Sequence, residues 1–244
     1  MSTKPLDDFT LCALSADLTM QDAGFVKEAF AGIARRYVVT NHVLSLGTDV
    51  LWRRKTARLV ASTKPKRVLD LATGSGDLAL AIQSACPEAQ ILGMDFSVPM
   101  MREAQLQNFR NLIAGDGMAL PVTNDCMDVV TVAFGLRNMA SWPRALREMA
   151  RVLKAGGQLF ILDFSLPRHP IMREPYLFYL KQVMPRIAGL LTGKREAYDY
   201  LCGSIEKFPS GVLMLNMLRD CGFPEARSIP LSGGIASLYI ATKG

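Results

Sequence analysis

The segment 68–78 constrains the fold of this chain more than any other. An apolar run ends at Asp70, glycines follow at Gly74 and Gly76, and a helix-like pattern begins directly after them. This order of strand, turn and helix is typical of a nucleotide-binding α/β domain, where glycines let the backbone approach a ligand closely. Asp95 lies about 20 residues beyond the turn, where such domains place an acid on the ribose hydroxyls. The segment therefore predicts a nucleotide-type cofactor at the ends of parallel strands.

The charges around the turn indicate which nucleotide fits. Gly74, Gly76 and Ala79 also satisfy the dinucleotide fingerprint. A pyrophosphate would lie at the helix start, however, where Asp77 would repel it. No Lys or Arg occurs between residues 68 and 99. Acidic side chains with no basic side chain among them suit a ligand that has a ribose, a free amino group and no phosphate. S-adenosylmethionine (SAM) is such a ligand, and its sulfonium and ammonium groups are cationic. The acids concerned are Asp70, Asp77, Asp95 and Asp116. The alternative role of Asp77 is to cap the helix and stabilise its dipole.

Composition narrows the class of protein. The 244 residues, half of them hydrophobic, suffice for one α/β domain with a full core. No apolar run reaches the roughly 18 residues of a membrane span. The first residues lack the pattern of a secretory signal. The chain has five scattered cysteines, no Cys-x-x-Cys motif and two histidines, so we expect no metal site. Unpaired, scattered cysteines also predict a reducing, cytoplasmic location.

The net charge of +6 comes with basic clusters at residues 53–58, 64–67 and 194–195. Such clusters are ordinarily solvated faces of a protein. The functional alternative is peripheral contact with an anionic membrane, to which each basic residue contributes on the order of 1 kcal/mol. Nucleic acid is not expected as a partner, because no binding module and no basic run interleaved with aromatic residues occurs.

The order of apolar patterns predicts one domain after a poorly ordered segment, residues 1–20. In its middle part, apolar runs alternate with helical periodicity, which predicts parallel strands joined by right-handed crossovers. We expect a helical cap over 21–61, a cofactor-binding core over 66–168, a helical insert over 169–208, and a closing helix and strands over 209–244. The predicted strands are 67–71, 90–95, 112–114, 127–134, 158–164, 225–231 and 237–242. The predicted helices of the core and closing parts are 77–86, 99–109, 143–153 and 209–221.

Several motifs give the chain a family resemblance. They include the amino-terminal pattern from Phe30 to Ser45, the cofactor turn, Phe134-Gly-Leu-Arg-Asn138 and Tyr198-x-Tyr-Leu-x-x-Ser-Ile205. With these, residues 25–243 resemble the ubiquinone/menaquinone biosynthesis C-methyltransferases, which methylate a ring carbon of a polyprenyl benzoquinol or naphthoquinol. Many methyltransferases share the cofactor turn, whereas the last two motifs are much more specific to the quinone enzymes.

The resemblance implies a fold and a cofactor. The fold is the α/β class I SAM-dependent methyltransferase fold, a Rossmann-like seven-stranded sheet with an antiparallel last strand and a helical cap. The crevice at the carboxyl ends of the strands would bind SAM. The implied cofactor-binding residues are Asp70, Thr73, Gly74, Ser75, Gly76, Asp95, Phe96, Asp116, Gly117 and Ala133. The chain departs from the family at Thr73, where glycine or alanine is common, at Asp116, where Asn is frequent, and at Val38, where Asp is usual.

The resemblance also implies residues for the acceptor. A hydroquinone carbon becomes nucleophilic when a neighbouring hydroxyl, with an ordinary pKa near 10, is held as the phenolate. Arg137 is the candidate cation because a fixed positive charge lowers the pKa of a nearby phenol, and Asn138 would hold the second oxygen. Further candidates are Tyr37 as a catalytic residue and Asn41, Tyr200 and Ser204 as substrate contacts. The structural alternatives are a cap and salt bridge for Arg137 and Asn138, and a core position for Tyr37.

The expected substrate is a lipid quinol, with demethylmenaquinol placed before its benzoquinol equivalent. The predicted helix around residues 176–191 is apolar on most sides. A core or homodimer contact explains this, and so does a groove for the lipid tail at the inner face of the membrane. Two other functions stay open: a methyltransferase of the same fold that acts on a soluble natural product, and a non-catalytic scaffold that binds the cofactor without turnover.

Overall fold

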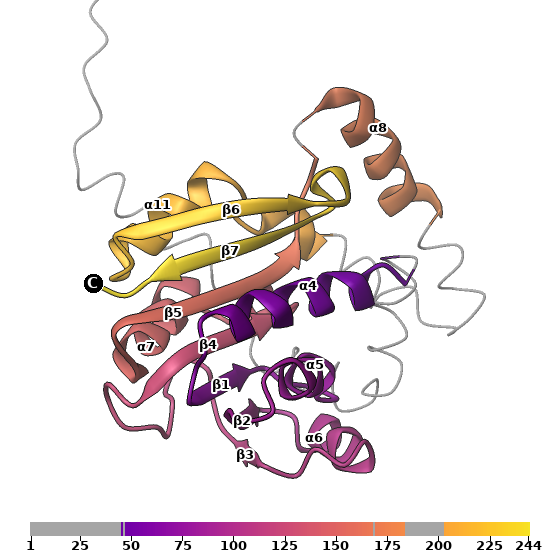
Figure 1. Ribbon diagram of the computed structural model, residues 1–244. Helices are drawn as coiled ribbons and strands as arrows, with labels where there is room; N and C mark the ends of the chain where they lie inside the picture. Colours follow the sequence, from indigo (N-terminus) through magenta and orange to yellow (C-terminus); the bar gives the residue numbers. More distant parts are fainter. Residues whose placement is uncertain (1–44, 46, 168, 184–202) are drawn as a thin grey trace, which may run out of the picture.

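The computed structural model describes residues 45, 47–167, 169–183 and 203–244. Within them, one seven-stranded sheet has the strand order β3-β2-β1-β4-β5-β7-β6 (Figure 1). The parallel strands are β1 (Arg67–Leu71), β2 (Gln90–Asp95), β3 (Leu112–Ala114), β4 (Met127–Ala133) and β5 (Leu153–Phe164). The last strand, β7 (Ala236–Thr242), is antiparallel to both β5 and β6 (Glu225–Leu231). The predicted sheet with an antiparallel last strand is therefore confirmed.

Helices cover both faces of the sheet (Figure 1). One face carries α4 (Asp49–Ser62), α5 (Asp77–Ala85) and α6 (Val98–Leu106), and the other carries α7 (Trp142–Val152) and α11 (Val212–Asp220). Successive strand residues alternate between the two layers, because side chains of a strand point to opposite faces. In β5, Phe160 and Leu162 pack under the first group of helices, while Ile161 packs under the second. Each layer thus has its own hydrophobic core.

Most predicted element bounds match the structure, and the differences have local causes. The helix predicted over 99–109 is α6 and ends at Leu106, because Asn108 adopts a left-handed φ of 66° and turns Phe109 into the core. Strand β4 ends one residue earlier than predicted, because Phe134 has a φ of 58°. Strand β5 begins before the predicted residue 158, since Leu153 already pairs with Met127 ahead of a register shift.

The described part of the predicted helical insert comprises α8 (Pro170–Phe178), the π-helical turn η2 (Tyr179–Val183) and residues 203–208, which are helical over 203–207. Tyr176 and Leu180 are buried in the core, whereas Ile171 and Phe178 are exposed. Residues 184–202 of the insert lie outside the described residues, as does most of the predicted cap. No helix of the described residues has the length and apolar character needed to cross a bilayer.

Helix α4 is the described part of the predicted cap, and aromatic contacts fix it to the sheet. The Trp52 ring lies 6.3 Å from the Phe134 ring and meets the Phe164 ring edge-on at 6.0 Å. The Trp52 indole N–H donates to Ser232 Oγ at 3.0 Å, in the 3-10 turn η3 (Ser232–Gly234). Phe134 and Phe164 follow or end β4 and β5, so α4 lies across the carboxyl ends of these strands.

Candidate active site

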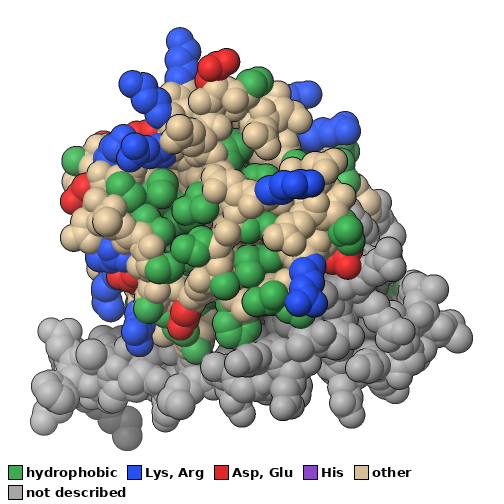
Figure 2. All heavy atoms as spheres, turned by 90° about the horizontal axis from the view of Figure 1, so that it is seen from below, with side chains coloured by type: hydrophobic (Ala, Val, Ile, Leu, Met, Phe, Trp, Pro, Cys, Tyr) green, Lys and Arg blue, Asp and Glu red, His purple; other side chains and the backbone are tan. Residues whose placement is uncertain are grey.

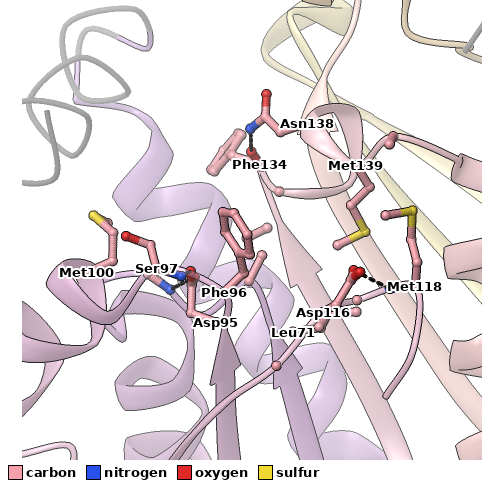
Figure 3. Close-up of a pocket in the computed structure, with 17 residues that line it drawn as sticks. Leu71, Asp95, Phe96, Ser97, Met100, Asp116, Met118, Phe134, Asn138 and Met139 are labelled. Atoms are coloured by element: carbon pink, nitrogen blue, oxygen red, sulfur yellow. Dashed lines mark hydrogen bonds between the residues drawn. The ribbon is translucent and has the colours of Figure 1, made fainter. Parts of the chain in front are cut away.

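A crevice opens at the carboxyl ends of the central parallel strands, the usual ligand site of open α/β sheets. Its walls come from the ends of β1, β2 and β4 and from the loops that follow β1, β2, β3 and β4. Figure 3 shows Asp95, Phe96 and Met100 along one wall, Asp116, Met118 and Met139 along the other, and Phe134 with Asn138 at one end. Chain segments far apart in the sequence therefore share one cavity, as the resemblance implied.

Asp95 joins two loops of the crevice. Its Oδ2 accepts the Gly74 N–H at 2.8 Å, and its Oδ1 accepts the Ser97 N–H at 2.8 Å. Burial raises the pKa of Asp95, and these backbone hydrogen bonds oppose that rise. Each carboxylate oxygen has a second lone pair, so Asp95 can still accept a hydrogen bond from a ribose hydroxyl. Its position fits the role predicted for it.

The glycine turn rests on Asp70, which is buried beneath it. Asp70 Oδ1 accepts the Thr131 hydroxyl at 2.5 Å, and its Oδ2 accepts the Thr73 hydroxyl at 2.7 Å. Burial raises the pKa of Asp70 to about 6. Asp70, Thr73 and Ser75 line a smaller cavity, the turn cavity, which shares Ala72, Gly74, Met100 and Ala133 with the main crevice. Asp70, Thr73, Gly74 and Ser75, which were predicted to bind the cofactor, thus line two adjoining cavities.

Gly74 and Gly76 have different roles. Gly74 lines the crevice with a φ of 58°, and a Cβ there would lie 3.1 Å from Met100 Cε. Gly76, with a φ of 82°, lies against α6, and a Cβ there would lie 3.2 Å from Ala104 Cβ. Gly76 lines neither the crevice nor the turn cavity. The structure therefore places Gly76 as a packing residue of the turn.

Asp77 is the first residue of α5, beside the turn. Its Oδ2 accepts the Ser75 hydroxyl at 2.6 Å, and Asp77 also lines the turn cavity. A carboxylate at this position stabilises the helix dipole and at the same time repels a phosphate. The two roles considered for Asp77 are compatible.

The wall around Asp116 is suited to an adenine ring. Asp116 Oδ1 accepts the Met118 N–H at 2.9 Å, and the carboxylate keeps acceptor capacity for an exocyclic amine. Gly117 lets the Met139 side chain approach, since a Cβ would lie 2.9 Å from Met139 Cε. The exposed Phe96 ring faces this region across the crevice (Figure 3). Flat apolar walls and one acceptor are what an aminopurine requires.

The residues present therefore fit SAM. Asp95 offers an acceptor for ribose hydroxyls, Asp116 offers one for the adenine amine between apolar walls, and the acids of the turn offer negative charge for the cationic end. Ala133 lines both cavities at the end of β4. Three methionines of the wall, Met100, Met118 and Met139, were not predicted from the sequence. They belong to no motif, and no spacing signal marked them.

Two strained residues hold the strand ends close together. Ala72 after β1 has a φ of 52°, and Phe134 after β4 has a φ of 58°. Both line the crevice. Positive φ is unfavourable for residues with a Cβ, and such strain persists where surrounding structure imposes it. Gly135 lies tightly against Ala72 at this point, since a Cβ at Gly135 would lie only 2.4 Å from Ala72 Cβ.

Substitution Gly135→Ala should therefore open the strand ends. We expect a loss of about 1–3 kcal/mol in the free energy of unfolding, as for other overpacked sites. We also expect weaker SAM binding, because Ala72 and Phe134 both line the crevice. Denaturant unfolding and calorimetry measure the two effects. Gly203→Ala is the matched control, since no atom of the described residues lies within 4 Å of a Cβ at Gly203. Equal behaviour of the two variants would contradict this account.

The structure places Arg137 differently from the expectation that it faces the substrate. Its side chain is fully buried in η1 (Leu136–Asn138), and its Nη1 donates to Asp163 Oδ1 at 2.6 Å and to the Phe134 carbonyl at 2.9 Å. The guanidinium carbon lies 5.4 Å from the Phe164 ring centroid. Burial raises the pKa of Asp163, and the charge of Arg137 opposes that rise. Arg137 does not line the crevice that the described residues form.

Asn138 does line that crevice, and its Nδ2 donates to the Phe134 carbonyl at 3.3 Å (Figure 3). Asn138 and Arg137 were both predicted to contact the substrate, but only Asn138 lines the crevice, whereas Arg137 is buried behind it. Of the other acceptor candidates, Ser204 is buried and does not line the crevice. Tyr37, Asn41 and Tyr200 lie outside the described residues, as does the departure at Val38.

Binding of SAM should depend on pH through Asp70. Below its pKa of about 6 the buried carboxyl is protonated, and a cationic ligand favours the charged form. Affinity should therefore fall as pH falls, by about tenfold between pH 7 and pH 5. The neighbouring Arg53 lowers and Asp95 raises the same pKa.

The variant Asp70→Asn isolates this contribution. Its amide keeps an acceptor for the Thr131 hydroxyl, and the Thr73 hydroxyl can turn to accept from it. Calorimetric titrations across the pH range should show a flatter profile in this variant than in the unsubstituted chain. Identical profiles would show that Asp70 does not titrate with binding. Asp95, whose pKa burial also raises, supplies the dependence that remains.

Comparison with solved structures supports the fold. A SAM-dependent methyltransferase from Thermotoga maritima, described as a possible histamine N-methyltransferase, superimposes with a TM-score of 0.62 at 16% identity, covering 90% of this chain and 100% of that one. At this identity the likeness shows the fold alone. It is the class I SAM-dependent methyltransferase fold that the resemblance implied.

Sequence relatives are much closer. The demethylmenaquinone methyltransferase of Thermus thermophilus is 38% identical over 88% of this chain and 99% of its own length. That of Deinococcus radiodurans is 39% identical over 91% of this chain and 95% of its own length. The ubiquinone/menaquinone biosynthesis C-methyltransferase UbiE of Syntrophotalea carbinolica is 40% identical over 86% of this chain and 90% of its own length.

The family model of these enzymes matches almost the whole chain, over residues 17–243. The predicted enzyme class and cofactor are confirmed with it: the chain is a methyltransferase whose methyl donor is SAM. With its crevice, its sheet order and this match, the protein belongs to the ubiE/COQ5 methyltransferase family.

Proposed function

We propose that this methyltransferase methylates a ring carbon of a polyprenyl quinol, with demethylmenaquinol converted to menaquinol. The observation that carries the proposal is that Phe134 and Asn138, from the motif most specific to quinone enzymes, line the same crevice as Asp95. The names of the relatives support it, since those of Thermus and Deinococcus are demethylmenaquinone methyltransferases. Since two of these relatives are named for the naphthoquinol reaction, we favour a naphthoquinol over a benzoquinol as the substrate.

When bound, SAM supplies an electrophilic methyl group for an in-line displacement by a carbon nucleophile. The protein has to align the acceptor ring with that methyl group and exclude water. Asn138 is placed to hydrogen-bond a ring oxygen of the quinol, and its own amide is oriented by the Phe134 carbonyl. Arg137 donates to the same carbonyl, so its role in this proposal is to position the segment from behind.

The quinone content of cells that depend on this protein tests the proposal. Loss of the protein should lead to a quinone that lacks one ring methyl group, as seen by mass spectrometry. The unsubstituted chain should restore the methylated quinone, and the nature of the accumulated ring identifies naphthoquinol or benzoquinol. An unchanged quinone profile would favour a soluble natural product as the acceptor. Restoration by a variant without SAM binding would favour a scaffold.

The proposed substrate has a tail that stays in the bilayer, so we further propose a peripheral membrane contact. Figure 2 shows the face with α6 and β3, where hydrophobic side chains gather between Lys and Arg side chains. Phe96, just before α6, and Val98 and Leu106, at the two ends of α6, are exposed, and Phe96 also lines the crevice. The basic residues of α6 and the next loop, Arg102 and Arg110, are exposed as well.

Sedimentation with anionic liposomes at low salt tests this contact. The variant Leu106→Glu should bind vesicles more weakly than the unsubstituted chain, because a charge replaces an exposed apolar side chain. Val212→Glu is the matched control on α11, on the other face of the sheet, where the valine is similarly exposed. No sedimentation of the unsubstituted chain, or equal loss in both variants, would contradict this docking face.

A further inference from the structure

Arg53 of α4 contributes to the lining of the turn cavity. It lines this cavity together with Asp70, Thr73, Ser75 and Asp77. It is also buried, with 8% of its surface exposed. Among the described residues that line the crevice and the turn cavity, Arg53 is the only basic side chain. A single cation therefore faces a space that is otherwise acidic.

The contacts of Arg53 leave part of its guanidinium available to a ligand. Nη1 donates to Asp49 Oδ2, and Asp49 Oδ1 also accepts the Ser45 hydroxyl at 2.7 Å. The guanidinium carbon lies over the Phe134 ring, 5.2 Å from its centroid. Within the described part of the chain, the other N–H groups of Arg53 have no acceptor. A guanidinium has five N–H donors in a planar fork that matches a carboxylate.

The side chain is held in this position before any ligand binds. Trp52, the preceding residue, packs on Phe134 and Phe164, which fixes the helix to the strand ends. One helical turn earlier, the buried Asp49 holds the guanidinium through the ion pair. A preorganised donor loses little entropy on binding, so its hydrogen bonds contribute more to affinity.

We propose that Arg53 binds the α-carboxylate of the methionyl end of SAM, while the acids of the turn face its ammonium group. That end is a zwitterion, and it requires a cation and an anion side by side. The turn cavity offers this pair, because Arg53, Asp70 and Asp77 all line it. The proposal rests on the proposed function only in taking SAM as the cofactor, and it does not depend on the acceptor.

Calorimetric titration with three ligands and no quinol tests this role. The ligands are SAM, S-adenosylhomocysteine, which keeps the carboxylate, and decarboxylated SAM, which lacks it. Arg53→Met should weaken binding of the first two by about 10- to 100-fold, as expected for a lost charge-assisted hydrogen bond. Its affinity for decarboxylated SAM should change far less, by no more than the small effect of losing the Arg53 charge beside Asp70. Lys55→Met is the control, because Lys55 is an exposed cation of the same helix that lines neither cavity.

The ligand comparison separates recognition from structural damage. An equal loss of affinity for SAM and decarboxylated SAM in Arg53→Met would overturn the proposal. Since this variant leaves Asp49 buried without its partner, Arg53→Lys is made as well. It keeps the charge and loses the fork, so it should weaken SAM binding while leaving decarboxylated SAM unaffected; no change for either ligand would also overturn the proposal. A chain that binds SAM through Arg53 but leaves quinols unmethylated would refute the proposed function alone.

Discussion

Arg137→Met should lower the free energy of unfolding by about 3–5 kcal/mol, the largest stability change expected for this protein. Arg137 and Asp163 form a fully buried ion pair, with Nη1 and Oδ1 2.6 Å apart. Without Arg137, Asp163 is a buried charge with no compensating cation. The pKa of Asp163, which burial already raises, would rise further, so the loss should be greatest at high pH. Denaturant unfolding measures this change.

The double variant Arg137→Met with Asp163→Asn separates the fold from the chemistry. Removing both charges should recover most of the lost stability, because neutral replacement of a buried pair is far less costly than breaking it. The amide introduced by Asp163→Asn retains an acceptor for the Phe164 N–H, which Asp163 Oδ1 accepts at 2.9 Å. If Arg137 is a positioning residue, turnover should recover together with stability. A stable double variant that binds SAM but has no turnover would contradict this and favour a direct contact of Arg137 with the substrate.

Asp95→Ala should weaken SAM binding by on the order of 100-fold and abolish detectable methyl transfer. The carboxylate is the expected acceptor for the ribose hydroxyls, and hydrogen bonds to a charged group contribute about 1.5–3 kcal/mol each. The variant also removes the acceptors of the Gly74 and Ser97 N–H groups, which loosens both loops of the crevice. Titration calorimetry measures the affinity directly.

The control for this variant is Glu88→Ala, which removes an exposed acid near the opposite ends of the strands. It should leave SAM affinity and stability unchanged. Circular dichroism of Asp95→Ala should show the secondary structure of the unsubstituted chain, since the sheet core does not involve Asp95. If a folded Asp95→Ala protein binds SAM as strongly as the unsubstituted chain, the ribose does not bind at Asp95. The orientation assigned to the cofactor would then be wrong.

The strands of the sheet were predictable because the sequence marks both the strands and the turns between them. Buried parallel strands require short apolar runs, and tight turns require residues that tolerate a left-handed φ. Strands β1, β2, β3 and β6 accordingly have the predicted bounds. The limits of α6 and β4 were missed because Asn108 and Phe134 adopt positive φ for tertiary reasons. At these two positions Phe109 is buried and Gly135 lies tightly against Ala72, and neither contact is visible in the local sequence.

The candidate site was predictable where a motif ties a residue to a strand end, as for Asp95, Asp116 and Asn138. It was not predictable where a side chain has a choice of directions. The motif places Arg137 beside the crevice, but burial against Phe164 and pairing with Asp163 turn it away. The sequence presents Arg53 as part of a solvated basic cluster, and only the packing of α4 on the sheet brings it to the turn cavity.

Ring-carbon methylation of a quinol is tested most directly with SAM that carries a deuterated methyl group and a short-chain demethylmenaquinol kept in its reduced form. We expect a product that carries the intact deuterated methyl on the ring carbon, formed by the unsubstituted protein and not by Asp95→Ala. The oxidised quinone should give no product, because it lacks the phenolic oxygen that makes the ring carbon nucleophilic. Label on a ring oxygen, or no transfer to any reduced naphthoquinol or benzoquinol by a protein that binds SAM, would contradict it.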